Sequence, residues 1–548
     1  MEKTKRLIPA WLLGIPLSYL MLAFLSNFYA SPIETGILTL LIHTFAALFM
    51  DLLVGRVKRD FQSKLVETGI AATLFMALTA FAWILFQMAG QFPRLFDAGF
   101  YQLETGKLIY FIVSVIFSLP LAVWMKSLAG KNNFQQTKFY IFLDEHLAGL
   151  TLAAFFFWVY LMIATIFNQP DFNADDIFFD ADSRLWRWRF ATEQVRDYYW
   201  RPVHPFVLLI IRPLVSVIAF FLKGDSLYAA FTLVALTGAL CVYLVWYFVK
   251  KSVGNNLYAL LIAALFGAST AQLVFSSLIE TYIFLGAVAL IFLVLLLENK
   301  PLPALLAAGL AAFGITISNF GQTVLAHILI KRDIKEWIRY GLIVAALVIP
   351  LTLLNNFIYP DSQPYFFDLS SYDREGHNSF PPTLQRANYL GRVMFLHSFV
   401  APEPLTFKEE IPFLKVWMFR ASIKKEPMRI GQYETWFGTS TAFLWLGFMV
   451  LGGILFLKNL RRQDNRFFLT LGLILLFNFT LHLQYGKDVF LYAVNWTYAI
   501  VIFLALAWKE LAEKRWFQIS LLVFIGLLLV NNSQLIETML NASGLYIK

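Results

Sequence analysis

The chain has 548 residues, of which 59% are hydrophobic, 17% aromatic and only 14% charged, and its mean hydropathy is +0.65. A soluble domain of this size carries more surface charge, so the composition excludes an ordinary cytosolic enzyme, a disordered chain and a disulfide scaffold. The net charge of +9 indicates basic cytoplasmic loops in a membrane protein, rather than a nucleic-acid partner. The single cysteine, Cys241, excludes an intrachain disulfide and a thiolate metal cluster.

Apolar runs of spanning or near-spanning length recur from one end of the chain to the other. They cover 7–30, 37–55, 65–92, 108–130, 148–167, 206–222, 227–249, 257–277, 280–297, 301–330, 340–358, 437–457, 467–483, 489–508 and 517–535. Each run is expected to be a helix, because lipid offers no partner to backbone polar groups and the alternation of a barrel strand is absent. The sequence therefore predicts an all-α polytopic membrane protein with about 13–15 membrane segments.

Basic residues at the ends of these runs predict the orientation of the chain. The clusters are Lys3/Lys5/Arg6, Arg56/Lys58/Arg59/Lys64, Lys131/Lys138, Lys250/Lys251, Lys331/Arg332/Lys335/Arg339, Lys458/Arg461/Arg462/Arg466 and Lys509/Lys514/Arg515. All can be cytoplasmic if 206–222 is a tilted or re-entrant element on the outer side, or if a break near 318–321 changes the parity. We favour the first alternative. Either topology places 168–205 and 360–436 outside.

These two outer segments divide the chain into four regions. Residues 1–146 are predicted to form an N-terminal accessory transmembrane module, and 147–359 a core whose first outer loop is 168–205. Residues 360–436 form a second outer loop, and 437–548 the C-terminal transmembrane helices. The second loop is rich in proline and aromatic residues. We expect it to lie along the membrane as short amphipathic helices.

Carboxylates and cations crowd into the first outer loop. The acids are Asp171, Asp175, Asp176, Asp180, Asp182, Glu193 and Asp197, and the cations include Arg184, Arg187, Arg189, Arg196 and Arg201. This mixture suits transfer chemistry on a phosphorylated lipid, because a carboxylate can deprotonate an acceptor hydroxyl while cations hold the leaving phosphate. The hard oxygen ligands of Asp180 and Asp182 suit Mg²⁺ or Mn²⁺. A solvated loop with internal ion pairs explains the same composition equally well.

Several short motifs follow one another in a characteristic order. They are Asp180-Ala181-Asp182-Ser183, His204-Pro205, Gly224-Asp225-Ser226, the segment 275–282 with Glu280 and Tyr282, and the segment 482–492 with His482, Tyr485 and Lys487. Over about 148–500 this order resembles the GT-C superfamily of polytopic glycosyltransferases, most of all its bacterial members that use polyprenyl-phosphate-linked sugars. The resemblance implies a GT-C-like helix bundle, an active site at the outer membrane face and an essential aspartate, here Asp180 or Asp182.

Together, the resemblance and the residue chemistry assign candidate roles. Asp180 and Asp182 are the predicted catalytic residues and the candidate metal ligands. The predicted substrate-binding residues are Arg184, Arg201, His204, Glu280, Tyr282, His482, Tyr485 and Lys487. Simpler roles remain open: Asp182 could cap a helix, His204 could end the loop, and Lys487 could pair with Asp488.

The leading hypothesis is a bacterial inner-membrane glycosyltransferase whose site faces outward. It would move one sugar from a polyprenyl-phosphate-linked donor to a lipid, glycan or protein acceptor. The alternatives are a transporter or flippase of lipid-linked saccharides, and a membrane glycan polymerase or ligase. The sequence contains no phosphate-binding loop, no His-Glu-x-x-His and no Gly-x-Ser-x-Gly, which argues against ATP-driven transport and metalloprotease chemistry.

Overall fold

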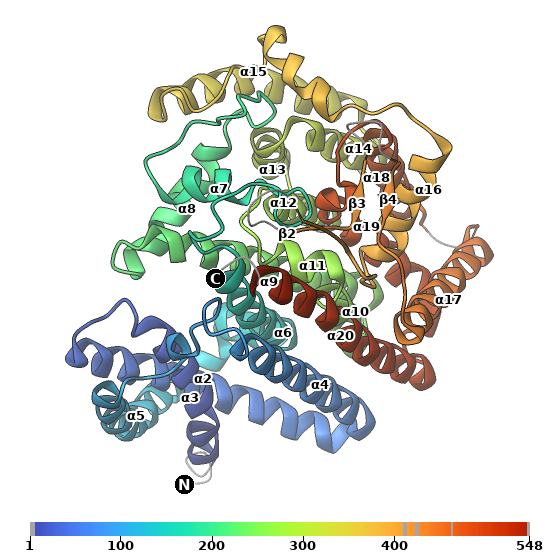
Figure 1. The fold of residues 1–548 in the computed structure, drawn as a ribbon. Helices are drawn as coiled ribbons and strands as arrows, with labels where there is room; N and C mark the ends of the chain where they lie inside the picture. The colour runs from blue at the N-terminus through green and yellow to red at the C-terminus, as the bar shows by residue number, and fades with distance from the viewer. Residues whose placement is uncertain (1–5, 409–413, 422–426, 462–463, 545–548) are drawn as a thin grey trace.

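The protein is a bundle of helices, seen in a computed structural model that describes residues 6–408, 414–421, 427–461 and 464–544 (Figure 1). Within these ranges eleven helices are long and apolar enough to cross a membrane. They are α2 (Leu7–Leu25), α3 (Pro32–Ser63), α4 (Leu65–Gly90), α5 (Thr105–Lys131, preceded by η1, Ala98–Tyr101), α6 (Lys138–Phe167), α9 (Ser226–Val253), α15 (Ile334–Ile358), α17 (Trp436–Asn459), α18 (Arg466–Gln484), α19 (Val494–Ala507, extended by η7, Trp508–Leu511) and α20 (Arg515–Gly544). The prediction of an all-α, multi-pass membrane protein is confirmed.

Shorter apolar helices account for the remaining predicted segments. In the described part of the chain they are α8 (Val207–Phe221), α10 (Asn256–Gly267), α12 (Tyr282–Leu297) and α13 (Leu302–Ile315), with α11 (Thr270–Phe275), η3 (Ile317–Asn319) and α14 (Phe320–Lys331) beside them. The 15 residues of α8 extend about 22 Å, less than the roughly 30 Å hydrocarbon core. The run 206–222 is therefore too short for a simple perpendicular crossing, and any crossings beyond eleven stay a prediction.

Ion pairs and hydrogen bonds join the basic helix ends into one continuous face, called the basic face below. The contacts are Arg59–Asp144, Lys250 to the Glu145 carbonyl, Lys251–Glu298, Lys331–Asn299, Arg466 to the Ile330 carbonyl, Arg515–Glu67 and Lys458–Glu510. These contacts link most of the predicted clusters, although Lys3, Lys5 and Arg462 lie outside the described residues. The clusters that these contacts link thus gather on one side, as the orientation rule predicts.

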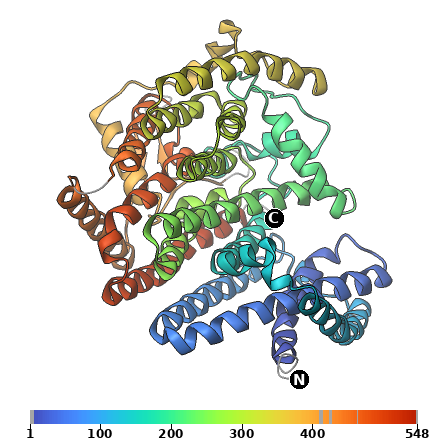
Figure 2. The ribbon, with the colours of Figure 1, turned by 180° about the vertical axis from the view of Figure 1, so that it is seen from behind.

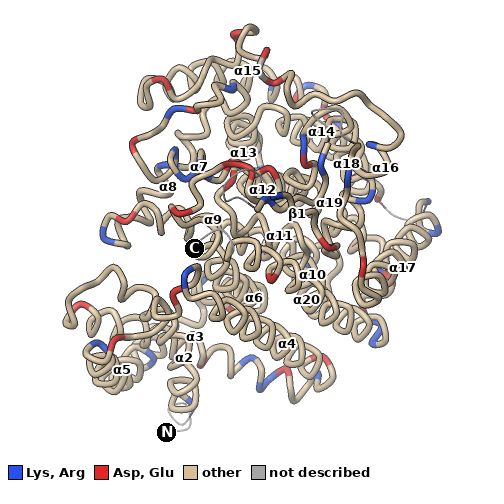
Figure 3. Tube along the Cα trace, in the orientation of Figure 1, with Lys and Arg blue, Asp and Glu red and all other residues tan. Residues whose placement is uncertain are grey.

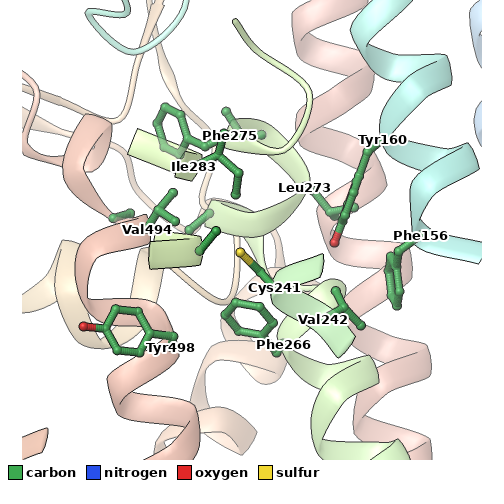
Figure 4. Close-up of a cluster of buried hydrophobic side chains, with 14 of the residues drawn as sticks. Phe156, Tyr160, Cys241, Val242, Phe266, Leu273, Phe275, Ile283, Val494 and Tyr498 are labelled. Carbon is green, nitrogen blue, oxygen red and sulfur yellow. The ribbon is translucent and has the colours of Figure 1, made fainter. Parts of the chain in front are cut away.

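The centre of the bundle is a large apolar core around α9. Figure 4 shows Cys241 of α9 among Phe156 and Tyr160 of α6, Phe266 of α10 and Ile283 of α12. All five side chains are buried, and such close packing is worth about 1.5–3 kcal/mol for each large apolar side chain. This core holds the helices whose far ends carry the candidate site.

The N-terminal helices divide between two neighbourhoods. Helices α2, α3 and α5 pack on one another around small apolar clusters of their own, and Figures 1 and 2 show them at one edge of the molecule. By contrast, α4 packs against α20, and its buried residues belong to the main core. The predicted boundary at residue 146 stays a prediction.

Short elements fill the two predicted outer loops. They are α7 (Ser183–Ala191), the 3₁₀ helix η4 (Leu369–Asn378), α16 (Leu384–Arg392) and the π-helix η5 (Val393–His397). Strands follow: β1 (Leu405–Lys408) pairs antiparallel with β2 (Leu414–Trp417), and β3 (Phe419–Arg420) with β4 (Arg429–Ile430). The expectation of amphipathic helices is wrong for these strand residues, because their alternation of basic and apolar side chains has the period of a strand.

Candidate active site

Both outer loops and two helix junctions converge at the ends of α6, α9, α12, α18 and α19 that lie opposite the basic face. The Phe179 amide donates to the Val416 carbonyl at 2.7 Å, and the Val416 amide donates to the Ile177 carbonyl at 2.8 Å. Strand β2 therefore holds the aspartate loop in place. Figure 3 shows acidic positions gathered near the start of α12, between α7 and β1. We call this side of the molecule the site face.

A tight turn presents Asp180. Asp176, Phe179 and Asp180 have φ angles of 62°, 56° and 63°, in the left-handed region that non-glycine residues seldom adopt. Two hydrogen bonds close the turn: the Asp176 amide donates to the Ala181 carbonyl at 3.1 Å, and the Ala181 amide to the Phe178 carbonyl at 3.0 Å. Phe179 anchors the turn in the core. Such strained backbone collects at functional sites, where the surrounding structure enforces it.

Asp180 is a buried carboxylate with like charges around it. Burial raises its pKa well above the usual range, and nearby Asp176 and Asp182 raise it further, while the positive charge of Lys487 opposes the shift. Asp176 lies 3.8 Å from Lys415. The Oδ2 of Asp180 accepts a long hydrogen bond of 3.5 Å from the Asp488 amide. A carboxylate with a raised pKa and little hydrogen bonding is suited to accept a proton.

Asp182 differs from Asp180 in having a strong partner. Its Oδ2 accepts a hydrogen bond from Arg201 at 2.6 Å, and the guanidinium of Arg201 stacks on Tyr199. Burial raises the pKa of Asp182 to about 6, and Arg201 opposes that shift. Asp182 occupies the cap position of α7, but its side chain makes no capping bond. The simpler helix-capping role is therefore wrong, and Asp182 belongs to a charge pair.

Glu280 fastens the aspartate loop to α12. Its Oε2 accepts from the Asp182 amide at 3.0 Å, and its Oε1 accepts from the Thr281 amide at 3.0 Å. Burial, with a smaller contribution from Asp182, raises the pKa of Glu280 to about 8. Both oxygens already serve backbone donors. The geometry thus gives Glu280 a role in positioning Asp182, and its predicted contact with substrate stays a prediction.

Aromatic rings form the other side of the site. The ring of Tyr492 lies 4.1 Å from His482, 5.0 Å from Tyr282 and 5.9 Å from Tyr485, measured between centroids. The Tyr485 hydroxyl donates to Oε2 of Glu375 at 2.7 Å. The structure therefore brings together the predicted residues of α12 and of segment 482–492. It adds Tyr492, which sequence reasoning did not select.

Two buried ions shape the turn that carries Lys487. Arg386 donates hydrogen bonds of 2.8–3.0 Å to the carbonyls of His482, Leu483, Tyr485 and Gly486. These bonds provide partners for carbonyl groups at the end of α18 that the helix itself leaves unpaired. Asp488 accepts from the Met418, Phe419 and Phe490 amides at 2.7–3.2 Å. Burial raises the pKa of Asp488 to about 7 despite these donors. Apart from Phe490, their partners are backbone groups distant in sequence, so no motif could have identified either role.

Lys487 has no ion-pair partner within 4.0 Å among the described residues. The oxygens of Asp488 face backbone amides, so the alternative of a Lys487–Asp488 pair is wrong in this structure. Its charge nevertheless acts on both Asp176 and Asp180. Lys487 is thus a cation beside the aspartate turn that remains available to an anion.

Arg184 and His204 serve local structure. Arg184 pairs with Asp175 at 2.9 Å and stacks between Trp188 and Tyr198. His204 is buried, its Nδ1 lies 2.6 Å from the Ile315 carbonyl, and its ring meets Trp186 edge to face. Burial lowers the pKa of His204 to about 3, so it is neutral. These contacts occupy both side chains, and their predicted substrate contacts stay predictions.

The predicted divalent metal finds little support in the donor set. Among the described residues, no three His, Cys, Asp or Glu side chains are arranged to hold a metal ion. Asp182 is already bonded to Arg201. A Mg²⁺ or Mn²⁺ ion at Asp180 and Asp182 therefore stays a prediction, and the proposed chemistry uses no metal.

The chain matches no protein-family model, no curated protein and no solved structure. No relative therefore supplies a role for these residues.

Proposed function

We propose that this protein is a GT-C-like membrane glycosyltransferase that moves one sugar from a polyprenyl-phosphate donor to a lipid, glycan or protein acceptor outside the cytoplasm. The observation that carries the proposal is the pairing of two groups: Asp180, buried with a raised pKa in a strained turn, and Lys487, a cation without an ion-pair partner in the described structure. General bases with tuned pKa values and a nearby cation for the leaving phosphate are what glycosyl transfer from a lipid phosphate requires.

In the proposed reaction, Asp180 takes the proton of the acceptor hydroxyl. The acceptor oxygen forms a bond to the anomeric carbon while the bond from that carbon to the phosphate oxygen breaks. The electron pair of the broken bond leaves with the polyprenyl phosphate, whose charge Lys487 stabilises. The proton stays on Asp180 until it passes to solvent.

Asp182 has a positioning role in this reaction. Its negative charge is balanced by Arg201 at 2.6 Å, so it is a weaker base candidate than Asp180. The pair also fixes the loop beside Asp180, since the Asp182 amide is held by Glu280. We therefore assign Asp180 the role of base and Asp182 a positioning role.

Transfer in proteoliposomes tests the proposal. The purified protein is offered a panel of polyprenyl-phosphate sugars, and labelled sugar is followed from donor to acceptor. Asp180→Asn should lower the rate at least about 100-fold, the usual contribution of a general base, and Asp182→Asn should lower it less. Asp171→Asn, an exposed position in the same loop, is the matched control. Full transfer by Asp180→Asn would show that the mechanism is wrong.

A further inference from the structure

Large apolar side chains are exposed on a segment of the site face that does not cross the membrane. Leu369 and Leu384 are 81% and 88% exposed, and Tyr365 and Phe367 are partly exposed. The rings of Tyr365 and Phe367 stack at 5.1 Å. Single exposed apolar residues are ordinary on protein surfaces, but a series of them marks an interaction site. We call residues 365–384 the rim segment, since Figure 1 shows the chain between α15 and α16 at the edge of the molecule.

Hydrogen bonds fix the level of the rim segment relative to the membrane helices. The Phe380 amide donates to the Gln484 carbonyl at 2.8 Å, and the Gly486 amide donates to the Asn378 carbonyl at 2.9 Å. Gln484 is the last residue of the candidate span α18. The segment also begins seven residues after Ile358, the last residue of the candidate span α15. Its two ends are therefore attached where two spans leave the membrane.

The charge of the rim segment indicates whether electrostatic attraction or apolar burial would bring it into contact with lipid. Within and just before it, the acids Asp361, Asp368, Asp373 and Glu375 outnumber the single arginine, Arg374. A basic amphipathic helix is drawn to anionic headgroups, but this composition is not. Contact with lipid would have to come from burial of apolar side chains.

We propose that the rim segment inserts Leu369 and Leu384 into the lipid leaflet on the site face. Its partner is the bilayer itself, met through apolar insertion and not through charge. The same segment carries Glu375, which holds the Tyr485 hydroxyl at 2.7 Å. Through this hydrogen bond, Glu375 links the lipid-contacting rim segment to the aromatic side of the candidate site. This inference is independent of the reaction proposed above.

Spin labelling tests the insertion directly. Cys241 is the single cysteine and is buried in α9, so Leu369→Cys and Leu384→Cys can each be labelled in the full-length protein. Both positions are so exposed that substitution removes little packing. Asp373→Cys, on the same 3₁₀ helix and exposed, is the aqueous control, and Phe443→Cys, 69% exposed on α17, is the lipid control. Collisions with oxygen and with a water-soluble nickel chelate are measured in zwitterionic vesicles.

The expected result is that labels at 369 and 384 collide more with oxygen than with nickel, as the label at 443 does. The label at 373 should collide more with nickel than with oxygen. The ratio of oxygen to nickel collisions at 369 and 384 should not rise when anionic lipid is added. A label at 369 or 384 that resembles position 373 overturns the proposal. So does a label that collides with neither reagent, because that result means protein covers the site.

Discussion

On the basic face, charged side chains join helix ends and stay partly in water: the side chains of Arg515 and Glu67 are 45% and 25% exposed. On the site face, Asp488 and Arg386 are completely buried, and Asp180 is only 9% exposed. Partly exposed pairs gain little free energy, whereas buried charges must be matched by hydrogen bonds. Both faces are charged, but among the described residues the site face bears the larger cost of desolvating its ions.

The difference shows what each set of charges does. A pair such as Arg515–Glu67 joins two helix ends through partly exposed side chains, and such pairs contribute little free energy. Arg386 and Asp488 are surrounded by specific backbone groups, and together they fix the turn that carries Tyr485 and Lys487. The site face therefore accepts costly burial to hold a few side chains in one geometry.

Replacing Arg386 should have the largest effect on stability. Arg386→Met removes the donors to four carbonyl groups at the end of α18, and each buried group left without a partner costs about 1–3 kcal/mol. We expect a loss of about 3 kcal/mol or more, measured as a lower Tm by intrinsic fluorescence in detergent.

Arg392→Met is the matched control for this substitution. Arg392 lies on the same helix, α16, but its side chain donates to the Gln432 side chain through an exposed contact. Its replacement should change the Tm slightly. Equal Tm losses for the two variants would mean that burial does not distinguish these arginines.

The sequence predicted those features of the two faces that depend on local signals. Apolar length predicted the spans, and the positions of the basic residues predicted the basic face, because both rules act on short stretches of chain. Asp180 and Lys487 lie more than 300 residues apart in sequence, and both were named as candidate site residues largely through the resemblance to a family. The roles of Arg386 and Asp488 could not be predicted, since their partners are backbone atoms whose position depends on the folded loops.

Stability should depend on pH through Asp488. Its folded pKa, raised by burial to about 7, exceeds the roughly 3.9 of an unfolded aspartate. The stability contributed by this shift is fully present below the unfolded value and is lost as the pH rises through 7. Asp488→Asn cannot ionise, so its Tm relative to wild type should rise between pH 5 and pH 8. One such group changes stability by at most about 1.4 kcal/mol per pH unit.

The control for Asp488 separates ionisation from packing. Asp488→Asn also weakens hydrogen bonds to the Met418 and Phe419 amides, which lowers the Tm by the same amount at every pH. Only the slope of the Tm difference against pH reports the buried charge. Asp171→Asn removes an exposed carboxylate and should leave that slope unchanged. A flat difference for Asp488→Asn would show that this carboxyl ionises alike in the folded and unfolded chain.

The smallest effect is expected on the basic face. Glu67→Gln removes the ion pair with Arg515 at 2.7 Å, and pairs exposed to this extent contribute about 0–1 kcal/mol. The Tm should fall slightly at low salt and less at high salt, because mobile ions screen partly exposed charges. A fall as large as that of Arg386→Met would mean that the basic face is fixed by specific pairs, and the contrast between the two faces would no longer hold. A small, salt-sensitive fall would agree with the weak contribution expected of partly exposed pairs.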